Sequence, residues 1–182
     1  MFPLIFARRD GGRIKLSAPA VTKLRDFEQH EEHQAEAGGV LVGRWIRETE
    51  DVVVDDVSTP GPKDRRSRRG FFRDRSHHQE VLDEAWRMSG GAFTWLGEWH
   101  THPEPRPRPS VVDLVGWGAR LHRDRAPGPA LFFVIVGTEE IAVWEWPRGL
   151  RVPRRLLLQT ADNGVGQLPP SMGPEVEDPA PE

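Results

Sequence analysis

Short apolar stretches bounded by charged residues, Gly or Pro recur along the chain, and between some of them apolar residues follow a helical spacing instead. Short runs and alternations are typical of β-strands, whereas repeats at every third or fourth position behind a capping residue indicate helices. We expect strands at residues 1–10, 14–16, 39–46, 52–57, 93–102, 130–136 and 141–146, and helices at 17–33, 77–88 and 110–121. This interleaved order predicts an α/β (α+β) fold.

Start and stop signals support the predicted helices. Ser17 and Ser110 are good N-caps, and Ser89-Gly90-Gly91 is a helix end. The buried stripes would consist of Val21, Leu24 and Phe27 in the first helix, and of Val81, Leu82, Ala85 and Met88 in the second.

The connections differ in chemistry. The charged stretch 47–51 separates two β-rich runs and predicts a hairpin, whereas residues 59–70 combine Pro, Gly and Arg and indicate a loop. Pro alternates with other residues through 103–109, which requires an extended path that cannot pair as a central strand.

Composition limits the domain organisation. With 182 residues, 37% hydrophobic and 29% charged, the chain has room for one domain with a substantial core. We assign residues 1–150 to that domain and 151–182 to a C-terminal extension rich in Pro and acid, part of which is too poor in apolar residues to fold alone. Residues 156–158 are expected to dock on the domain.

Net charge and cysteine content exclude several classes of protein and of metal site. A net charge of -3 gives no general attraction to nucleic acid, and no apolar run could span a bilayer. The apolar residues of 1–10 precede the arginines, the reverse of a secretory signal. Without cysteine there is no disulfide, thiol nucleophile or thiolate-bound zinc. We therefore expect a cytoplasmic protein without direct nucleic-acid binding, in which any metal is held by histidine and carboxylate.

The segment from Gly97 to Asp113 contains the clearest candidate chemistry. His100 and His102 occupy alternate positions of a predicted strand, so both side chains point to one face and can bind one metal ion. The proline segment then returns the chain, which lets Asp113 in the first turn of the next helix supply a carboxylate oxygen. Three such ligands leave the fourth position of a tetrahedral zinc open, as in catalytic sites.

Two further residues complete a hydrolytic site. Water attack needs a base that also delivers a proton to the leaving amine, and Glu36, just before the run 39–43, is the best candidate. Glycines that flank this run would permit close approach of other backbone. The hydroxyl of Ser110 could hydrogen-bond the oxyanion of a tetrahedral intermediate.

Each part of the pattern also has a structural interpretation. A lone His-x-His is more often surface or core histidine than a metal site, and Glu36 alone would be a solvated carboxylate. Ser110 and Asp113 form by themselves a motif close to a capping box. Their joint occurrence is what favours a metal site, since a cap also holds its side chains rigid.

The joint pattern resembles a known family. Glu36-Ala37-Gly38-Gly39-Val40-Leu41-Val42-Gly43, His100-x-His102, seven residues and Ser110-x-x-Asp113 are similar to the JAMM signature of the JAB/MPN metalloproteases. The resemblance covers about residues 14–146. It implies a cytidine-deaminase-like domain with a mostly antiparallel mixed sheet and about three helices. It also implies one Zn²⁺ on His100, His102 and Asp113, Glu36 as general acid and base, and Ser110 as oxyanion donor.

The resemblance also implies a substrate class. Family members cleave isopeptide or peptide bonds after ubiquitin or ubiquitin-like tails, and a substrate-contacting insertion follows their early strands. Here that region carries Arg65, Arg66, Arg68 and Arg69, which would suit an acidic partner, although a solvated loop is the simpler interpretation. Eukaryotic members selective for lysine linkages use cysteine in an extra zinc site, which this chain cannot form.

Within the family, the wording Gly-Glu-Trp-His-Thr-His-Pro-Glu resembles stand-alone bacterial JAB peptidases of CBASS antiphage operons. Those reverse a conjugation of the C-terminus of a cyclic-oligonucleotide synthase (CD-NTase). One alternative is a processing peptidase for a bacterial ubiquitin-like or sulfur-carrier protein. Another is a non-catalytic MPN scaffold, against which the intact ligand set argues. RadC-like JAB domains usually read His-Asn-His-Pro-Ser-Gly and have a helical region ahead, neither of which is present.

Other residues near the motif receive structural assignments. Trp95, Trp99 and Trp117 are expected in the core or the pocket wall. Glu98 shares the strand face of His100 and is expected to have a supporting role. His77 and His78 begin a predicted helix and are expected to be solvated.

Overall fold

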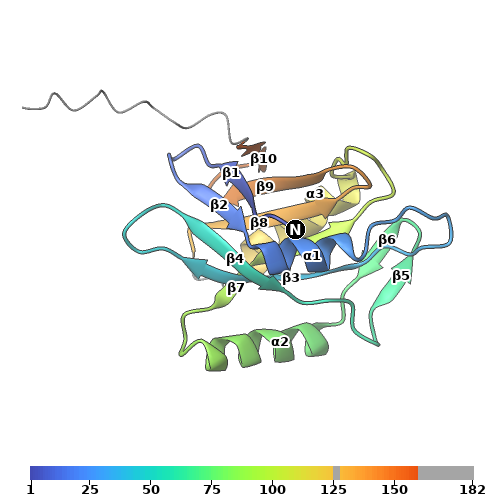
Figure 1. Cartoon of the computed structure of the whole chain (residues 1–182), viewed down its shortest axis with the longest axis horizontal. Coiled ribbons are helices and arrows are strands. Elements are labelled where there is room, and N and C mark those ends of the chain that lie inside the picture. Colours follow the sequence, from blue (N-terminus) through green and yellow to red (C-terminus); the bar gives the residue numbers. More distant parts are fainter. Residues whose placement is uncertain (125–127, 160–182) are drawn as a thin grey trace, which may run out of the picture.

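One strongly curved mixed sheet organises the protein (Figure 1). The computed structural model describes residues 1–124 and 128–159. Within them the sheet has the order β10-β9-β8-β7-β3-β4-β2-β1-β11. Pairing is parallel at β2–β4 and β7–β8 and antiparallel elsewhere. The strands are β1 Leu4–Ala7, β2 Arg13–Leu16, β3 Gly38–Trp45, β4 Val52–Val57, β7 Thr94–Thr101, β8 Ala130–Val136, β9 Ile141–Pro147, β10 Arg154–Arg155 and β11 Leu157–Leu158.

Helices cover both faces of the sheet, and a small hairpin projects from it (Figure 1). Every residue of β8 is buried, as expected for a strand covered on both faces. Its alternate side chains join two clusters, one with α1 and one with α3. The second helix, α2, lies against β3 and β7. The bounds are α1 Ala18–Arg25, α2 Arg75–Met88 and α3 Val111–Arg123, and the hairpin consists of β5 Arg65–Ser67 and β6 Gly70–Phe72.

The structure confirms the predicted fold class and most predicted elements. The hairpin formed by β3 and β4 is present, and β8 matches its predicted range. Ser17, Asp74 and Ser110 cap the three helices. None of the helices in the described part of the chain is long and apolar enough to cross a membrane.

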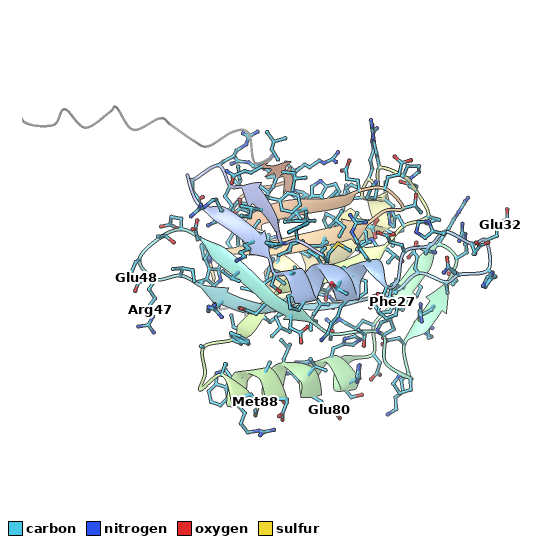
Figure 2. All side chains as sticks on the ribbon, in the orientation of Figure 1. Phe27, Glu32, Arg47, Glu48, Glu80 and Met88 are labelled. Carbon is cyan, nitrogen blue, oxygen red and sulfur yellow. The ribbon has the colours of Figure 1, made fainter. Side chains whose placement is uncertain are left out.

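Three predictions about elements were wrong. The first helix ends at Arg25 rather than near residue 33, because residues 28–34 are polar and offer no apolar face to bury. Residues 59–70 are not all loop, since they include β5 and the start of β6. Met88, assigned to a buried stripe, is 73% exposed at the end of α2 (Figure 2).

The expectation of solvated histidines at the start of α2 was also wrong. His78 is fully buried and bonds on both sides, from Nδ1 to Ser58 Oγ at 2.6 Å and from Nε2 to Asp64 Oδ2 at 3.0 Å. His77 is half-buried and bonds the carbonyl of Thr59 at 3.1 Å. The two rings therefore fix α2 and the segment before the β5–β6 hairpin to the sheet.

The end of the described chain closes the sheet. Arg154–Arg155 pairs with β9 at one edge, Leu157–Leu158 pairs with β1 at the other, and the side chain of Leu156 enters the core. Because one residue separates these strands, the two edges lie side by side. Arg8 at the end of β1 accordingly forms a buried ion pair with Glu145 of β9 at 2.8 Å. Most of the predicted extension, residues 160–182, lies outside the described residues.

Candidate active site

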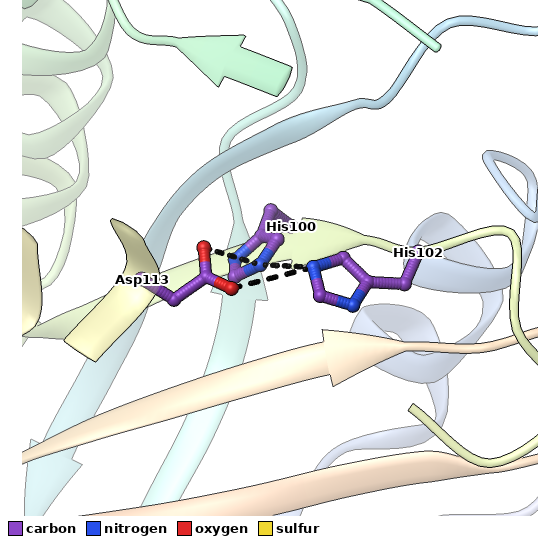
Figure 3. Close-up of side chains that lie close together, drawn as sticks. All are labelled: His100, His102 and Asp113. Atoms are coloured by element: carbon purple, nitrogen blue, oxygen red, sulfur yellow. Dashed lines mark hydrogen bonds and ion pairs between the residues drawn. The ribbon is translucent and has the colours of Figure 1, made fainter. Parts of the chain in front are cut away.

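Three side chains, from the end of β7, the residue that follows it and the first turn of α3, converge at one point (Figure 3). The Nε2 atoms of His100 and His102 lie 3.1 Å apart. Asp113 Oδ1 lies 3.2 Å from His100 Nε2, and its Oδ2 lies 3.5 Å from His102 Nε2. The structure thus brings together the three residues predicted as metal ligands.

Local structure explains the convergence. His100 lies in β7, and His102 directly follows the last residue of this strand in an extended path, where its N–H donates to the carbonyl of Val136 at 2.9 Å. The ring of Trp117 packs edge-on against His100. The proline segment is fastened to the turn between β8 and β9, where Thr138 N–H donates to the carbonyl of Glu104 at 2.9 Å. This attachment aims the start of α3, and with it Asp113, at the histidines.

A capping box holds Asp113. Its backbone N–H donates to Ser110 Oγ at 3.2 Å, and Ser110 N–H donates to Asp113 Oδ2 at 2.6 Å. The Ser110 hydroxyl also donates to Oδ2, at 2.7 Å. Ser110 is exposed, lies next to the three converging side chains and directs its hydroxyl at Asp113. Ser110 and Asp113 thus form a helix-capping box, and the same box also places Asp113 in the cluster of predicted metal ligands.

The donor set fits a zinc ion. A tetrahedral zinc with bonds of about 2.0–2.1 Å holds its ligand atoms roughly 3.3 Å apart, close to the separations in this cluster. Burial opposes ionisation of Asp113, but hydrogen bonds from His100 and His102 outweigh it and hold the pKa of this carboxyl well below its usual range. Burial likewise opposes protonation of His102, yet Asp113 raises the pKa of this ring. The cluster therefore stabilises a positive charge placed among these three side chains.

Glu36 lies beside the cluster because of the strand register. Gly38 of β3 pairs with His100 of β7, and Thr101 N–H donates to the carbonyl of Ala37 at 2.9 Å. Continuing this antiparallel ladder places Glu36 opposite His102. The side chain is buried, and burial raises its pKa to about 7 against the opposing charge of His102. A carboxyl group that titrates near neutral pH is suited to both accept and donate a proton.

The β5–β6 hairpin holds the backbone of Glu36. Glu36 N–H donates to the carbonyl of Ser67 at 2.8 Å, and Arg66 Nε donates to the carbonyl of Glu36 at 2.7 Å. Arg66 also reaches the carbonyl of Ala35, and Arg68 those of Glu31 and Gln34. Sequence reasoning missed this clamp, since side-chain bonds to backbone carbonyls leave no pattern in the sequence.

Close approach of backbone to the residues after Glu36 was expected from the glycines, and the structure shows it. A Cβ on Gly39 would lie 2.3 Å from the carbonyl oxygen of Ser58, and one on Gly43 would lie 1.9 Å from that of Val53. Any larger residue at these positions would displace β3 and, with it, Glu36 two residues before the strand begins.

A cavity of about 880 Å³ contains these groups. Glu36, Ser110 and the three predicted ligands line one part of it. Arg65 and Arg69 of the hairpin line another, whereas Arg66 and Arg68 do not. Substrate contact therefore remains a prediction that best suits Arg65 and Arg69. The other lining residues include Phe71, Phe72, Arg73, Glu98, Val112, Gly116, Trp117 and Arg120.

The tryptophans and Glu98 have the expected supporting positions. Trp117 lines the cavity and stacks on Phe133 at 4.4 Å, and Trp99 is buried in the core. Glu98 is paired with Arg73 and Arg120. Strand parity predicted the face of Glu98, but not its two partners from distant parts of the chain.

Comparison with known proteins identifies the family. Residues 17–148 match the model described as prokaryotic homologs of the JAB domain. The chain belongs to this family. The fold and the enzyme class predicted from the sequence, a peptidase-type hydrolase, are thereby confirmed.

Named relatives of this JAB-family chain include several isopeptidases. It is 35% identical over 137 residues to the CD-NTase/cGAS isopeptidase of Vibrio cholerae serotype O1, covering 75% of this chain and 84% of that protein. It is 34% identical over 117 residues to the CD-NTase/cGAS isopeptidase of Escherichia coli, covering 64% and 74%. The probable metalloprotease y4qB of Sinorhizobium fredii is 31% identical over 139 residues, covering 75% and 84%.

A solved structure shares the fold of this JAB-family chain. Protein DSY2949 from Desulfitobacterium hafniense superposes with a TM-score of 0.53 at 23% identity, covering 77% of this chain and 87% of that one. At this identity, the likeness concerns the fold alone.

Proposed function

We propose that this protein is a zinc-dependent isopeptidase that cleaves the bond joining the C-terminus of a CD-NTase or a ubiquitin-like protein to a target amine, in antiphage defence. The observation that carries the proposal is the convergence of His100, His102 and Asp113 beside the buried Glu36, in one cavity. The names of the isopeptidase relatives support the substrate class.

His100, His102 and Asp113 would hold the zinc ion through two Nε2 atoms and a carboxylate oxygen. When bound, zinc polarises the scissile carbonyl and lowers the pKa of a water molecule to about 7. The end of β7 and the capping box of α3 would hold these ligands in place, because both elements pack on the core through buried side chains such as Trp99 and Trp117.

Glu36 would move the protons. Its carboxylate accepts a proton from the attacking water as the new C–O bond forms, and returns it to the lysine amine as the C–N bond breaks. A pKa near 7 keeps both protonation states accessible at neutral pH. Ser110 would donate its hydroxyl hydrogen to the developing oxyanion, which requires the bond to Asp113 to be exchanged.

Arg65 and Arg69 would contact an acidic part of the protein substrate, since both line the same cavity on the hairpin side. Their contribution is uniform binding of ground and transition states. Substitutions there should therefore change KM more than kcat.

The test is incubation of purified protein with two fusion substrates. In one the C-terminus of a CD-NTase is joined to a reporter, and in the other the C-terminus of a ubiquitin-like protein is joined to the same reporter. Cleavage at the junction is expected with wild type, and none with Glu36→Gln, while zinc content by metal analysis stays the same. A Glu36→Gln protein that cleaves at the wild-type rate would refute the mechanism. A protein that binds no zinc would leave only a scaffold function.

A further inference from the structure

A second group of charged side chains lies in the same cavity, away from the predicted metal ligands. Arg73 precedes α2, Glu98 belongs to β7 and Arg120 to α3, so three elements meet here. Arg73 Nη2 donates to Glu98 Oε1 at 2.6 Å. Arg120 Nε lies 3.1 Å from the same oxygen.

The charges of this group do not balance. Two guanidinium groups share one carboxylate, which leaves a net positive charge. Nε of Arg73 is buried and makes no hydrogen bond to any described residue, whereas the buried Nε of Arg120 faces Glu98 as an ion pair without hydrogen-bond geometry. The side chain of Arg73 is 14% exposed and that of Arg120 is 42% exposed, so Arg120 can still reach a molecule in the cavity. A ligand with carboxylate oxygens would balance the excess positive charge and bind the exposed part of the Arg120 guanidinium group.

The position of the group relates it to the bond that is cut. Glu98 precedes His100 by two residues on β7, a distance of about 7 Å along a strand. Arg120 follows Asp113 by two turns on α3, about 10 Å along a helix. An extended chain advances about 3.3 Å per residue, so a substrate running along this groove would place its second or third residue from the reacting carbonyl here.

Between these points the groove is open. Gly116 lines the cavity on α3, and a Cβ at this position would meet nothing within 4 Å. Glycine inside a helix is less favourable than alanine, so its presence here is not explained by helix stability. The absence of a side chain at Gly116 thus leaves room for the main chain of a bound substrate to pass over this turn of α3.

We propose that Arg73 and Arg120, held in place by Glu98, form a subsite that binds an acidic side chain of the substrate, two or three residues from the scissile bond. This inference rests on the proposed function for the location of that bond. It assigns to Glu98 the task of spacing the two guanidinium groups, and to Arg120 the direct contact.

The probe is a set of labelled peptides, each joined through its C-terminal carboxyl group to a lysine side chain by an isopeptide bond. In each peptide one position on either side of this bond carries Glu or, in its counterpart, Gln. Binding is measured by fluorescence polarisation with the full chain carrying Glu36→Gln, so that no turnover is needed. At one position two or three residues from the bond, the Glu peptide should bind about tenfold more tightly than its Gln counterpart. Arg120→Gln should remove this preference and leave the affinity for the Gln peptide unchanged.

Arg123→Gln is the matched control, because Arg123 is exposed at the end of the same helix. It should retain the full Glu preference. Arg73→Gln should reduce the preference as well, with a thermal melt recorded to show that the protein is folded. Equal binding of Glu and Gln peptides at every position would overturn the subsite, as would a preference that survives Arg120→Gln.

Cleavage of the same peptides by the chain with Glu36 intact separates the two proposals. Turnover without any Glu preference would contradict the subsite while the isopeptidase function stands. Absence of turnover, together with an Arg120-dependent preference in binding, would support the subsite and contradict the proposed reaction.

Discussion

Arg66 decides between two interpretations of the arginine-rich hairpin. From the sequence it was a candidate for substrate contact or simply a solvated residue, whereas the structure shows its Nε donating to the carbonyl of Glu36 at 2.7 Å. Replacing Arg66 by Gln removes this bond and the bond to the carbonyl of Ala35. Hydrogen bonds to charged groups are worth about 1.5–3 kcal/mol, and discounting for solvent screening at this exposed residue leaves about 1 kcal/mol.

The expected effect on stability is therefore small, and that on catalysis is larger. A loss of about 1 kcal/mol lowers Tm by roughly 2–4 °C in a protein of this size. A displacement of a catalytic group by about 1 Å can cost on the order of a hundredfold in rate, so we expect kcat to fall about tenfold to a hundredfold. KM should change little, since Glu36 acts in proton transfer.

Steady-state cleavage of a reporter fusion measures both constants, with zinc content and a thermal melt as checks on the folded state. Arg66→Lys keeps the charge but loses the fork geometry, and should resemble Arg66→Gln. Arg47→Gln is the control, since Arg47 lies at the opposite end of the molecule from the β5–β6 hairpin (Figure 2). An increase in KM at unchanged kcat would refute the positioning role and restore the interpretation as a substrate contact.

Three further predictions follow from the same structure. Chelation of zinc should abolish cleavage, and added zinc should restore it; activity that persists in metal-free protein would contradict the assigned ligands. Gly116→Ala should stabilise α3 by up to about 1 kcal/mol, seen as a higher Tm, but lower kcat/KM if substrate passes over this residue; an unchanged kcat/KM would place the substrate elsewhere. Burial lowers the pKa of His78 despite its bond to Asp64. The folded state therefore takes up this proton less readily than the unfolded state, and stability should fall as pH drops below about 6.5, by at most about 1.4 kcal/mol per pH unit. Denaturant unfolding of wild type and His78→Gln between pH 7 and 5 measures this, and an equal pH dependence in both would contradict the assignment.

Periodicity and capping rules were sufficient for the parts of the site that lie on regular elements. Strand parity placed His100 and His102 on one face, and the capping motif placed Asp113 at a helix start. Glu36 was harder, because its location depends on a register between β3 and β7 that local pattern does not specify.

Other features could not be inferred from local sequence. His78 is polar and near a helix start, which suggests solvent, but Ser58 and Asp64 satisfy both ring nitrogens and permit full burial. The helix predicted to reach residue 33 was extended too far because Phe27 continues the apolar spacing; in the structure it packs against Trp99 from outside the helix. Both cases depend on tertiary partners distant in the sequence.

The closure of the sheet by residues 154–158 has a consequence for synthesis and for truncation. Within the described part of the chain, residues 154–158 are synthesised after all the other strands, so until they emerge both β1 and β9 present unpaired backbone groups. A chain shortened to residue 153 would keep every residue assigned to catalysis but would expose two edges at once. Such edges are templates for pairing with another chain. We therefore expect that a shortened protein would fail first by self-association, well before its active site is disturbed.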